Sequence, residues 1–287
     1  MAERKYRTAP AKINLVLEVT GRRPDGYHEI DTVLQTLALA DGVTLTLGGR
    51  PGIHVSGPYA KGTPADDTNL AWRAAQELAR VMDRDASELA IELDKQIPPA
   101  GGLGGGASDA AAVIRMLGKT WGASAGQQLH AANAIGSDEA FFLAGGTARA
   151  RGRGEKVEVL PPLRPQPVVL FLPLATIEHK TTRMFAALDT LPFDSGGVAE
   201  AFAHRSSRPV QGAEVFNAFE RVAFDVFDGL AALWEALESR IGEPVHLAGA
   251  GPTLFWIGAN ASVAARVVTA GSGLPCSVLG TTTAQAE

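Results

Sequence analysis

PPAGGLGGGASDAAA spans residues 98–112 and places five glycines directly before a run of alanines. Glycine adopts positive φ angles and lets a ligand approach the backbone closely. A helix that begins directly after the glycines offers unpaired N–H groups and the positive end of its dipole. The stretch therefore predicts an anion site suited to a phosphate chain, on a helix that begins at Ser108.

Three other interpretations of this stretch are weaker. A plain linker, followed by a helix capped by Ser108 or Asp109, would rarely need so many glycines. A Walker A loop requires a lysine after the glycines, and none follows here. Residues 102–107 fit the dinucleotide fingerprint G-x-G-x-x-[GA]. Two prolines precede those glycines, however, and no strand ending in an acid follows, so an NAD-dependent dehydrogenase remains a minor alternative.

The composition limits the class of protein. The chain has 287 residues, 46% of them hydrophobic and 20% charged, and a net charge of −5. These values are typical of a globular protein of about two domains, and they disfavour a nucleic-acid binder. No uninterrupted apolar stretch is long enough to span a membrane. Cys276 is the only cysteine. With no apolar signal core at the N-terminus, we expect a cytoplasmic protein without disulfides.

Hydrophobic periodicity predicts an α+β fold of two units. Strands are expected over residues 12–20, 27–39, 42–47, 89–97 and 168–174, and helices over 66–82, 108–121, 179–188 and 216–237. Ile13, Leu15, Leu17 and Val19 alternate with polar residues, so Lys12 and Asn14 should point into one cavity. Four prolines in residues 161–167 mark the expected boundary between a domain at 1–160 and a domain at 161–287.

The glycine stretch resembles the central phosphate-binding motif of the GHMP kinases. Three further stretches resemble segments of the same family, in the family's order across nearly the whole chain: APAKINLVLEVTGRRPDGYHEI (9–30), IGSDEAFFLAGGTARARGRGE (135–155) and LAGAGPTLFW (247–256). The doubled glycines and the GYHE segment are most similar to one branch. That branch phosphorylates the 2-hydroxyl of a cytidine-diphosphate-linked methylerythritol in the non-mevalonate isoprenoid pathway.

The resemblance implies an ATP-dependent small-molecule kinase that uses Mg²⁺, acting as a monomer or weak homodimer. It implies a ribosomal-protein-like N-terminal domain with a left-handed βαβ unit, a ferredoxin-like C-terminal domain, and a site in the cleft between them. Asp138 would accept or orient the proton of the substrate hydroxyl, and Lys12 would pair with it. An ammonium beside a carboxylate favours its ionised form and stabilises developing negative charge. Without the resemblance, Lys12 would be taken for a solvated strand lysine and Asp138 for a helix-end acid.

The resemblance also assigns the two binding regions. The ATP region comprises Asn69, Leu70, Pro98, Gly101, Gly102, Leu103, Gly104, Gly105, Gly106, Ala107 and Ser108. The substrate region comprises Asn14, Tyr27, His28, Thr181, Phe185, Gly249 and Gly251. Tyr27 and Phe185 would hold the two faces of the cytosine ring, and His28 would bind its edge; the two aromatic residues could instead be ordinary core residues.

The chain departs from the family pattern at three places. Ala107 replaces the first of two serines, Glu139 and Ala140 replace Val-Pro after Asp138, and alanines replace two serines in residues 248–250. Glu139 could bind a metal, repel the charge of Asp138 or point to solvent, so the Mg²⁺ ligands stay unassigned. Another GHMP kinase with a different alcohol, or a catalytically silent nucleotide-binding protein, remains an alternative.

Overall fold

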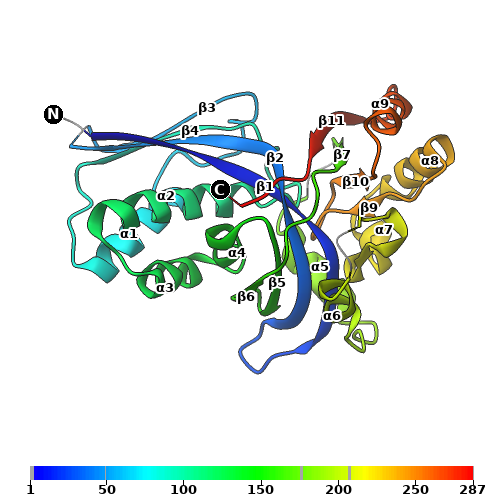
Figure 1. The fold of residues 1–287 in the computed structure, drawn as a ribbon, viewed down its shortest axis with the longest axis horizontal. Coiled ribbons are helices and arrows are strands. Elements are labelled where there is room, and N and C mark those ends of the chain that lie inside the picture. Colours follow the sequence, from blue (N-terminus) through cyan, green and yellow to red (C-terminus); the bar gives the residue numbers. More distant parts are fainter. Residues whose placement is uncertain (1–2, 49, 175–176, 206–207, 287) are drawn as a thin grey trace.

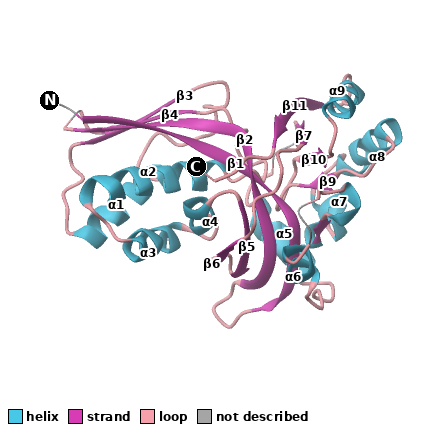
Figure 2. Cartoon of the chain, viewed as in Figure 1, coloured by secondary structure: helices cyan, strands magenta, loops and turns pink. Residues whose placement is uncertain are grey.

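Figure 1 shows the computed structural model, which describes residues 3–48, 50–174, 177–205 and 208–286. Two sheets form its framework, and helices pack beside each of them (Figure 2). No helix in these ranges is long and apolar enough to cross a membrane. The expected α+β class with two units therefore agrees with the arrangement of the chain.

The larger sheet has seven strands in the order β3-β4-β2-β1-β8, with β5 pairing with β2 and β6 with β5. Its strands are β1 (Glu3–Arg22), β2 (His28–Leu47), β3 (Gly52–Ser56), β4 (Leu89–Asp94), β5 (Thr147–Gly152), β6 (Lys156–Val159) and β8 (Phe216–Asn217). Four helices lie together beside this sheet in Figure 1: α1 (Leu70–Met82), α2 (Gly105–Trp121), α3 (Ala125–Ile135) and α4 (Glu139–Ala144).

The smaller sheet has the strand order β11-β7-β10-β9. Its strands are β7 (Pro167–Pro173), β9 (His246–Leu247), β10 (Leu254–Ile257) and β11 (Cys276–Thr282). The other helices are α5 (Lys180–Leu188), α6 (Val198–Ala203), α7 (Ala223–Val226), α8 (Leu230–Ile241) and α9 (Ala261–Ala270), with 3₁₀ turns η1 (Gly212–Glu214) and η2 (Ala218–Arg221). The boundary that we propose at residues 160 and 161 falls between β6 and β7, although β8 joins the larger sheet.

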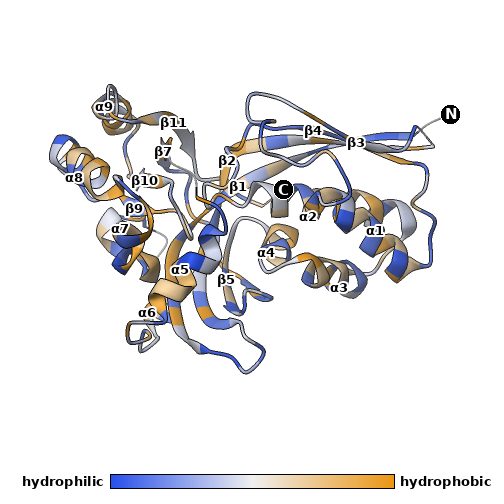
Figure 3. Ribbon diagram, turned by 180° about the vertical axis from the view of Figure 1, so that it is seen from behind, coloured by the Kyte–Doolittle hydropathy of each residue, from blue (hydrophilic) through white to orange (hydrophobic). Residues whose placement is uncertain are grey.

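Helix α1 shows how the sequence determines local structure. Its buried residues recur at helical spacing: Ala71, Ala74, Ala75, Leu78 and Ala79. Figure 3 shows hydrophobic and hydrophilic residues on the same helix. The Asn69 side chain accepts a hydrogen bond from the N–H of Ala71 at 2.9 Å and so begins the helix.

The polar residues in the middle of β1 are buried, which strand alternation alone would not predict. Lys12, Asn14 and Glu18 are 5%, 2% and 1% exposed. The reason is that other elements cover both faces of this strand; Glu18, for example, accepts a hydrogen bond from the N–H of Ala199 at 2.8 Å. Shifts in register interrupt the β1–β2 pairing on either side of Lys12 and Asn14.

Several predicted elements were wrong in their limits; β1, for example, runs from Glu3 to Arg22, whereas a strand was expected over residues 12–20. Residues 28–47 form one strand, because pairing with β1 continues through Gly42 opposite Thr8. Residues 216–237 do not form one helix, because Phe216 and Asn217 pair with β1 and Gly229 adopts φ 77° before α8. Helix α2 begins at Gly105 and not at Ser108.

Candidate active site

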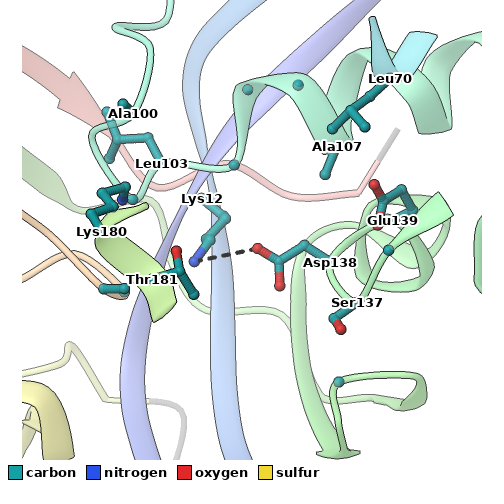
Figure 4. A pocket seen from close by; sticks show the side chains of 18 of the residues that line it. Lys12, Leu70, Ala100, Leu103, Ala107, Ser137, Asp138, Glu139, Lys180 and Thr181 are labelled. Carbon is teal, nitrogen blue, oxygen red and sulfur yellow. Dashed lines mark ion pairs between the residues drawn. The ribbon is translucent and has the colours of Figure 1, made fainter. Parts of the chain in front are cut away.

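A cavity of about 890 Å³ lies where β1, β2, the glycine stretch and the first turn of α5 meet (Figure 4). It is lined by Lys12 from β1, by residues 101–107 and by Asp138, which directly precedes α4. Segments far apart in the sequence therefore share one concave site.

The glycine stretch forms one wall of this cavity, and its backbone requires glycine at two positions. Gly102 and Gly104 have φ 86° and 74°. A Cβ atom at Gly102 would lie 1.9 Å from the carbonyl oxygen of Ala248, and one at Gly104 would lie 2.8 Å from the ring of Phe142. Gly104 begins α2 without a side-chain cap. The N–H groups of the first turn are therefore available to an anion.

Lys12 and Asp138 form the charged centre of the cavity. Lys12 Nζ lies 3.7 Å from Asp138 Oδ2, and the lysine side chain is 6% exposed. A chain of hydrogen bonds orients the ammonium: it donates to Asn14 Oδ1 at 2.7 Å, and Asn14 donates to Thr32 Oγ1 at 2.8 Å. Thr32 in turn donates to the carbonyl of Val16 at 2.6 Å. The ammonium is thus fixed before any ligand binds.

Glu139 is buried beside this pair and does not point to solvent. It is 2% exposed, and its Oε2 atom has no hydrogen-bond partner among the described residues. Burial, with a smaller repulsion from Asp138, raises the pKa of Glu139 to about 7. Figure 4 places this carboxyl beside Ala107, on the nucleotide side of the cavity as we expect it.

An aromatic stack lies at another part of the cavity wall. The rings of His28 and Phe185 are parallel to within 13°, with centroids 4.3 Å apart. His28 Nε2 lies 2.6 Å from Asp189 Oδ1, which fixes the orientation of the imidazole. Tyr27 is half exposed, and the Arg153 guanidinium lies 5.1 Å from its ring centroid. The structure thus brings His28, and not Tyr27, onto the face of Phe185.

Comparisons with known proteins identify the family to which the chain belongs. Residues 69–146 match the family described as GHMP kinases N terminal domain. The 4-diphosphocytidyl-2-C-methyl-D-erythritol kinases of Exiguobacterium sibiricum and Bacillus subtilis are 37% and 36% identical to the chain over 252 residues. In both cases the match covers 86% of this chain and 86% of the relative. The chain belongs to the 4-diphosphocytidyl-2-C-methyl-D-erythritol kinase family.

Solved structures support the fold of this GHMP kinase. A crystal structure of 4-(cytidine 5'-diphospho)-2C-methyl-D-erythritol kinase matches with a TM-score of 0.78 and 31% identity, over 98% of this chain and 100% of that one. A crystal structure of L. major mevalonate kinase matches with a TM-score of 0.67 and 14% identity, over 98% of this chain and 96% of that one, which supports the fold alone. The predicted family and its two-domain α+β architecture are confirmed.

All but two of the residues that we expected at the kinase site line the cavity. Ser108 does not, because α2 begins one turn earlier and turns this side chain away from the site. It is 1% exposed and borders a second, smaller cavity with Pro10 and Thr36. Gly251 is also absent from the lining; its carbonyl oxygen accepts a hydrogen bond from Lys180.

A buried charge cluster that was not predicted from the sequence lies beneath the glycine stretch. The ammonium of Lys95 binds the carboxylates of Asp41 and Asp109. Asp41 also accepts hydrogen bonds from the N–H groups of Gln96 and Ile97, the second at 2.8 Å. The cluster therefore holds the chain that enters the glycine stretch against the first turns of α2. A lysine just before the prolines and an acid just after the glycines were the available signals.

Lys180 is a second cavity cation that the sequence analysis missed. It is the first residue of α5 and donates a hydrogen bond to the carbonyl of Gly251. Burial and repulsion from Lys12 lower the pKa of Lys180 to about 8, although Asp138 opposes the shift. Its position directly before Thr181 was the only signal in the sequence.

Proposed function

We propose that this chain transfers the γ-phosphoryl group of ATP to the 2-hydroxyl of 4-diphosphocytidyl-2-C-methyl-D-erythritol. The products are the 2-phosphate and ADP, in isoprenoid precursor biosynthesis by the non-mevalonate pathway. One observation carries the proposal: the Lys12–Asp138 pair shares a single cavity with an uncapped helix N-terminus and with the His28–Phe185 stack. The uncapped N-terminus of α2 suits a phosphate chain, and the aromatic stack suits a nucleobase.

The nucleotide would bind along the glycine stretch. The free N–H groups at the start of α2 would bind its phosphates, because both the partial positive charge and the absence of side chains favour an anion there. Asn69 and Leu70 line the same cavity at the start of α1 and would border the adenine. This arrangement leaves the terminal phosphoryl group facing Lys12.

The acceptor alcohol would lie between Lys12 and Asp138. As the hydroxyl oxygen bonds to the γ-phosphorus, the bond from that phosphorus to the bridging oxygen of ADP breaks, and the hydroxyl proton passes to the Asp138 carboxylate. Lys12 stabilises the negative charge on the transferred group and is already oriented by Asn14. Such a reaction depends mainly on positioning and charge stabilisation.

The family implies a magnesium ion. No group of three or more His, Cys, Asp or Glu side chains in the described ranges could hold a metal by itself. Glu139 fits as a single protein ligand, because its carboxyl lines the cavity and has a buried oxygen without a partner. When bound with the nucleotide, Mg²⁺ would neutralise phosphate charge.

The remaining inferences concern the whole protein. We infer a cytoplasmic enzyme that is a monomer or weak homodimer, and we retain the division into domains at 1–160 and 161–287. The alternatives are a GHMP kinase for another alcohol and a silent nucleotide-binding protein. The aromatic stack of His28 and Phe185 in the cavity wall disfavours the first, and the paired Lys12 and Asp138 disfavour the second.

A coupled ADP-release assay tests the proposal with four alcohols: the cytidyl diphospho-erythritol, mevalonate, homoserine and galactose. We expect turnover with the cytidyl compound alone. Turnover with mevalonate alone would overturn the assigned substrate. No turnover with any alcohol, together with tight ATP binding, would instead support the silent nucleotide-binding protein.

A further inference from the structure

Lys180 is a partly buried cation whose role the reaction described above leaves open. It lines the cavity together with Thr181 and Thr182, the next two residues of α5. In Figure 4, Lys12 lies between Lys180 and Asp138, so two ammonium groups and one carboxylate follow one another across the site. The hydrogen bond to the carbonyl of Gly251 holds the Lys180 side chain at the cavity wall.

Among the residues that the structure describes, this cation has no counter-ion of its own. Among the ion pairs of the described residues, Asp138 pairs with Lys12, and no carboxylate lies within ion-pair distance of Lys180 Nζ. A carbonyl oxygen offers only a partial charge in exchange for the water that burial removes. Burial and the charge of Lys12 accordingly lower the pKa of Lys180 to about 8. An anion beside Lys180 would replace the lost solvation and restore the protonated form.

The first turn of α5 adds to the positive potential at this point. His179 precedes the helix with φ 51° and makes no side-chain cap. The first N–H groups of α5 therefore lack partners within the helix, and the positive end of its dipole faces the same wall as Lys180. A partly buried ammonium and a helix N-terminus thus converge on one part of the cavity.

The direction of α5 identifies the anion. Phe185 and Lys180 lie on the same helix, five residues apart, which corresponds to about 7.5 Å of rise. A base that stacks on the side of Phe185 that His28 does not cover would have about this distance for its sugar and phosphates to extend toward the start of α5. The ATP phosphates have a separate N-terminus, that of α2, at Gly105. The anion at Lys180 is then the phosphate of the acceptor and not that of the donor.

We propose that Lys180, together with the N-terminus of α5, binds the diphosphate group of a cytidine-diphosphate-linked substrate. The inference rests on the proposed function, because it takes the base at Phe185 as given. It adds a residue that selects acceptors by their diphosphate. Charged groups that face Lys180 are Lys12 on β1 and Asp138 before α4. Substrate affinity should fall above pH 8 as Lys180 loses its proton.

Binding of cytidine and of cytidine diphosphate, measured by titration calorimetry, tests this inference. The ratio of the two dissociation constants reports what the diphosphate contributes. In the wild type we expect cytidine diphosphate to bind more tightly than cytidine. Lys180→Met should weaken the binding of cytidine diphosphate by about 10- to 100-fold, because it removes a charged hydrogen bond. The affinity for cytidine should not change. Lys180→Arg should keep most of the preference.

Two further variants separate this role from others. Phe185→Ala should weaken the binding of cytidine and of cytidine diphosphate by a similar factor, since it removes stacking alone. Lys119→Met, at the exposed far end of α2, controls for the loss of one positive charge. It should change the affinity for neither cytidine nor cytidine diphosphate. Circular dichroism melting curves would serve as the control that each variant is folded.

Each contrary result has a distinct meaning. An unchanged ratio in Lys180→Met would overturn the diphosphate assignment and leave the proposed function intact. Weaker ATP binding in that variant, with cytidine diphosphate unaffected, would place Lys180 on the donor phosphates and would also overturn it. A wild type that binds neither cytidine nor its diphosphate would refute both the inference and the proposed acceptor.

Discussion

The backbone N–H of Lys12 donates a hydrogen bond of 2.9 Å to the carbonyl oxygen of Leu103. The strand that carries the cavity lysine is thereby attached to the loop that would hold the phosphates. The lysine stem also packs close to Gly104. We therefore expect a change in the glycine stretch to move the Lys12 ammonium, which couples the proposed phosphate site to the proposed chemistry.

Gly104→Ala should reduce activity by more than a loss of stability alone would explain. A Cβ atom at this position would lie 3.1 Å from Lys12 Cγ and 2.8 Å from the ring of Phe142. It would push the ammonium away from its position beside Asp138. Displacement of a positioned group by about 1 Å costs on the order of 100-fold in rate, so we expect kcat/KM to fall by about 100-fold in steady-state assays.

Gly122→Ala is the matched control for that variant. Gly122 ends α2 with φ 72°, close to the 74° of Gly104, and no atom lies within 4 Å of its added Cβ. The left-handed conformation alone costs about 1–2 kcal/mol. We expect both variants to lose that stability in urea unfolding and Gly122→Ala to keep its activity. Equal activities in the two variants would contradict the coupling between Gly104 and Lys12.

Asp138→Asn should nearly abolish turnover and leave ATP affinity unchanged. The amide keeps the size of the side chain but cannot take the hydroxyl proton. General-base contributions are typically 10²- to 10⁴-fold, so we expect kcat to fall by about that range. Fluorescent-nucleotide titration should give the wild-type ATP dissociation constant, and Asp67→Asn on the exposed surface before α1 serves as the control. A variant that keeps most of its rate would remove Asp138 from the chemistry.

The cavity residues were predictable because local geometry determines much of their placement. Strand alternation puts Lys12 and Asn14 on one side, and the glycines before a helix produce an exposed N-terminus. The motif order supplied what local rules cannot, namely that Asp138 lies within 3.7 Å of Lys12.

Long-range contacts explain what the sequence did not predict. Residues 216–237 have a helical pattern, yet Asn217 donates hydrogen bonds of 2.8 Å to the carbonyls of Leu247 and Gly249 and pairs with β1. Lys180 likewise is held in place by Gly251, and Lys12 lowers its pKa; both residues lie far from it in the chain. Single-sequence periodicity contains no information on such partners.

Phe185→Ala should raise the KM for the cytidyl substrate. The Phe185 ring packs on His28 at 4.3 Å and presents an aromatic surface to the cavity. Stacking of a base on an aromatic side chain contributes about 1–3 kcal/mol, which corresponds to an increase in KM of about tenfold or more with kcat little changed. Steady-state assays should also show a higher KM for the cytidyl substrate in Tyr27→Ala. Phe224→Ala, which removes the partner of Trp234 outside the cavity, should not change KM.

Asp109→Asn should make stability less dependent on pH. Burial and repulsion from Asp41 raise the pKa of Asp109 to about 7 in the folded protein, and Lys95 offsets this only in part because it is shared between two carboxylates. The folded state thus holds the proton more tightly than the unfolded chain does. This contribution to stability is complete below about pH 4, the ordinary pKa of the group, and is lost as the pH rises through 7.

Urea unfolding at pH 5.5 and pH 8 measures this contribution. The wild type should lose stability between the two values, and Asp109→Asn should lose less, since its amide carries no charge yet still accepts a hydrogen bond from Lys95. Asp228→Asn, on the exposed surface before α8, should keep the wild-type dependence. An equal loss in Asp109→Asn and the wild type would mean that the Asp109 carboxyl is ionised in the folded protein at both values. The single charge of Lys95 would then balance both of its acidic neighbours.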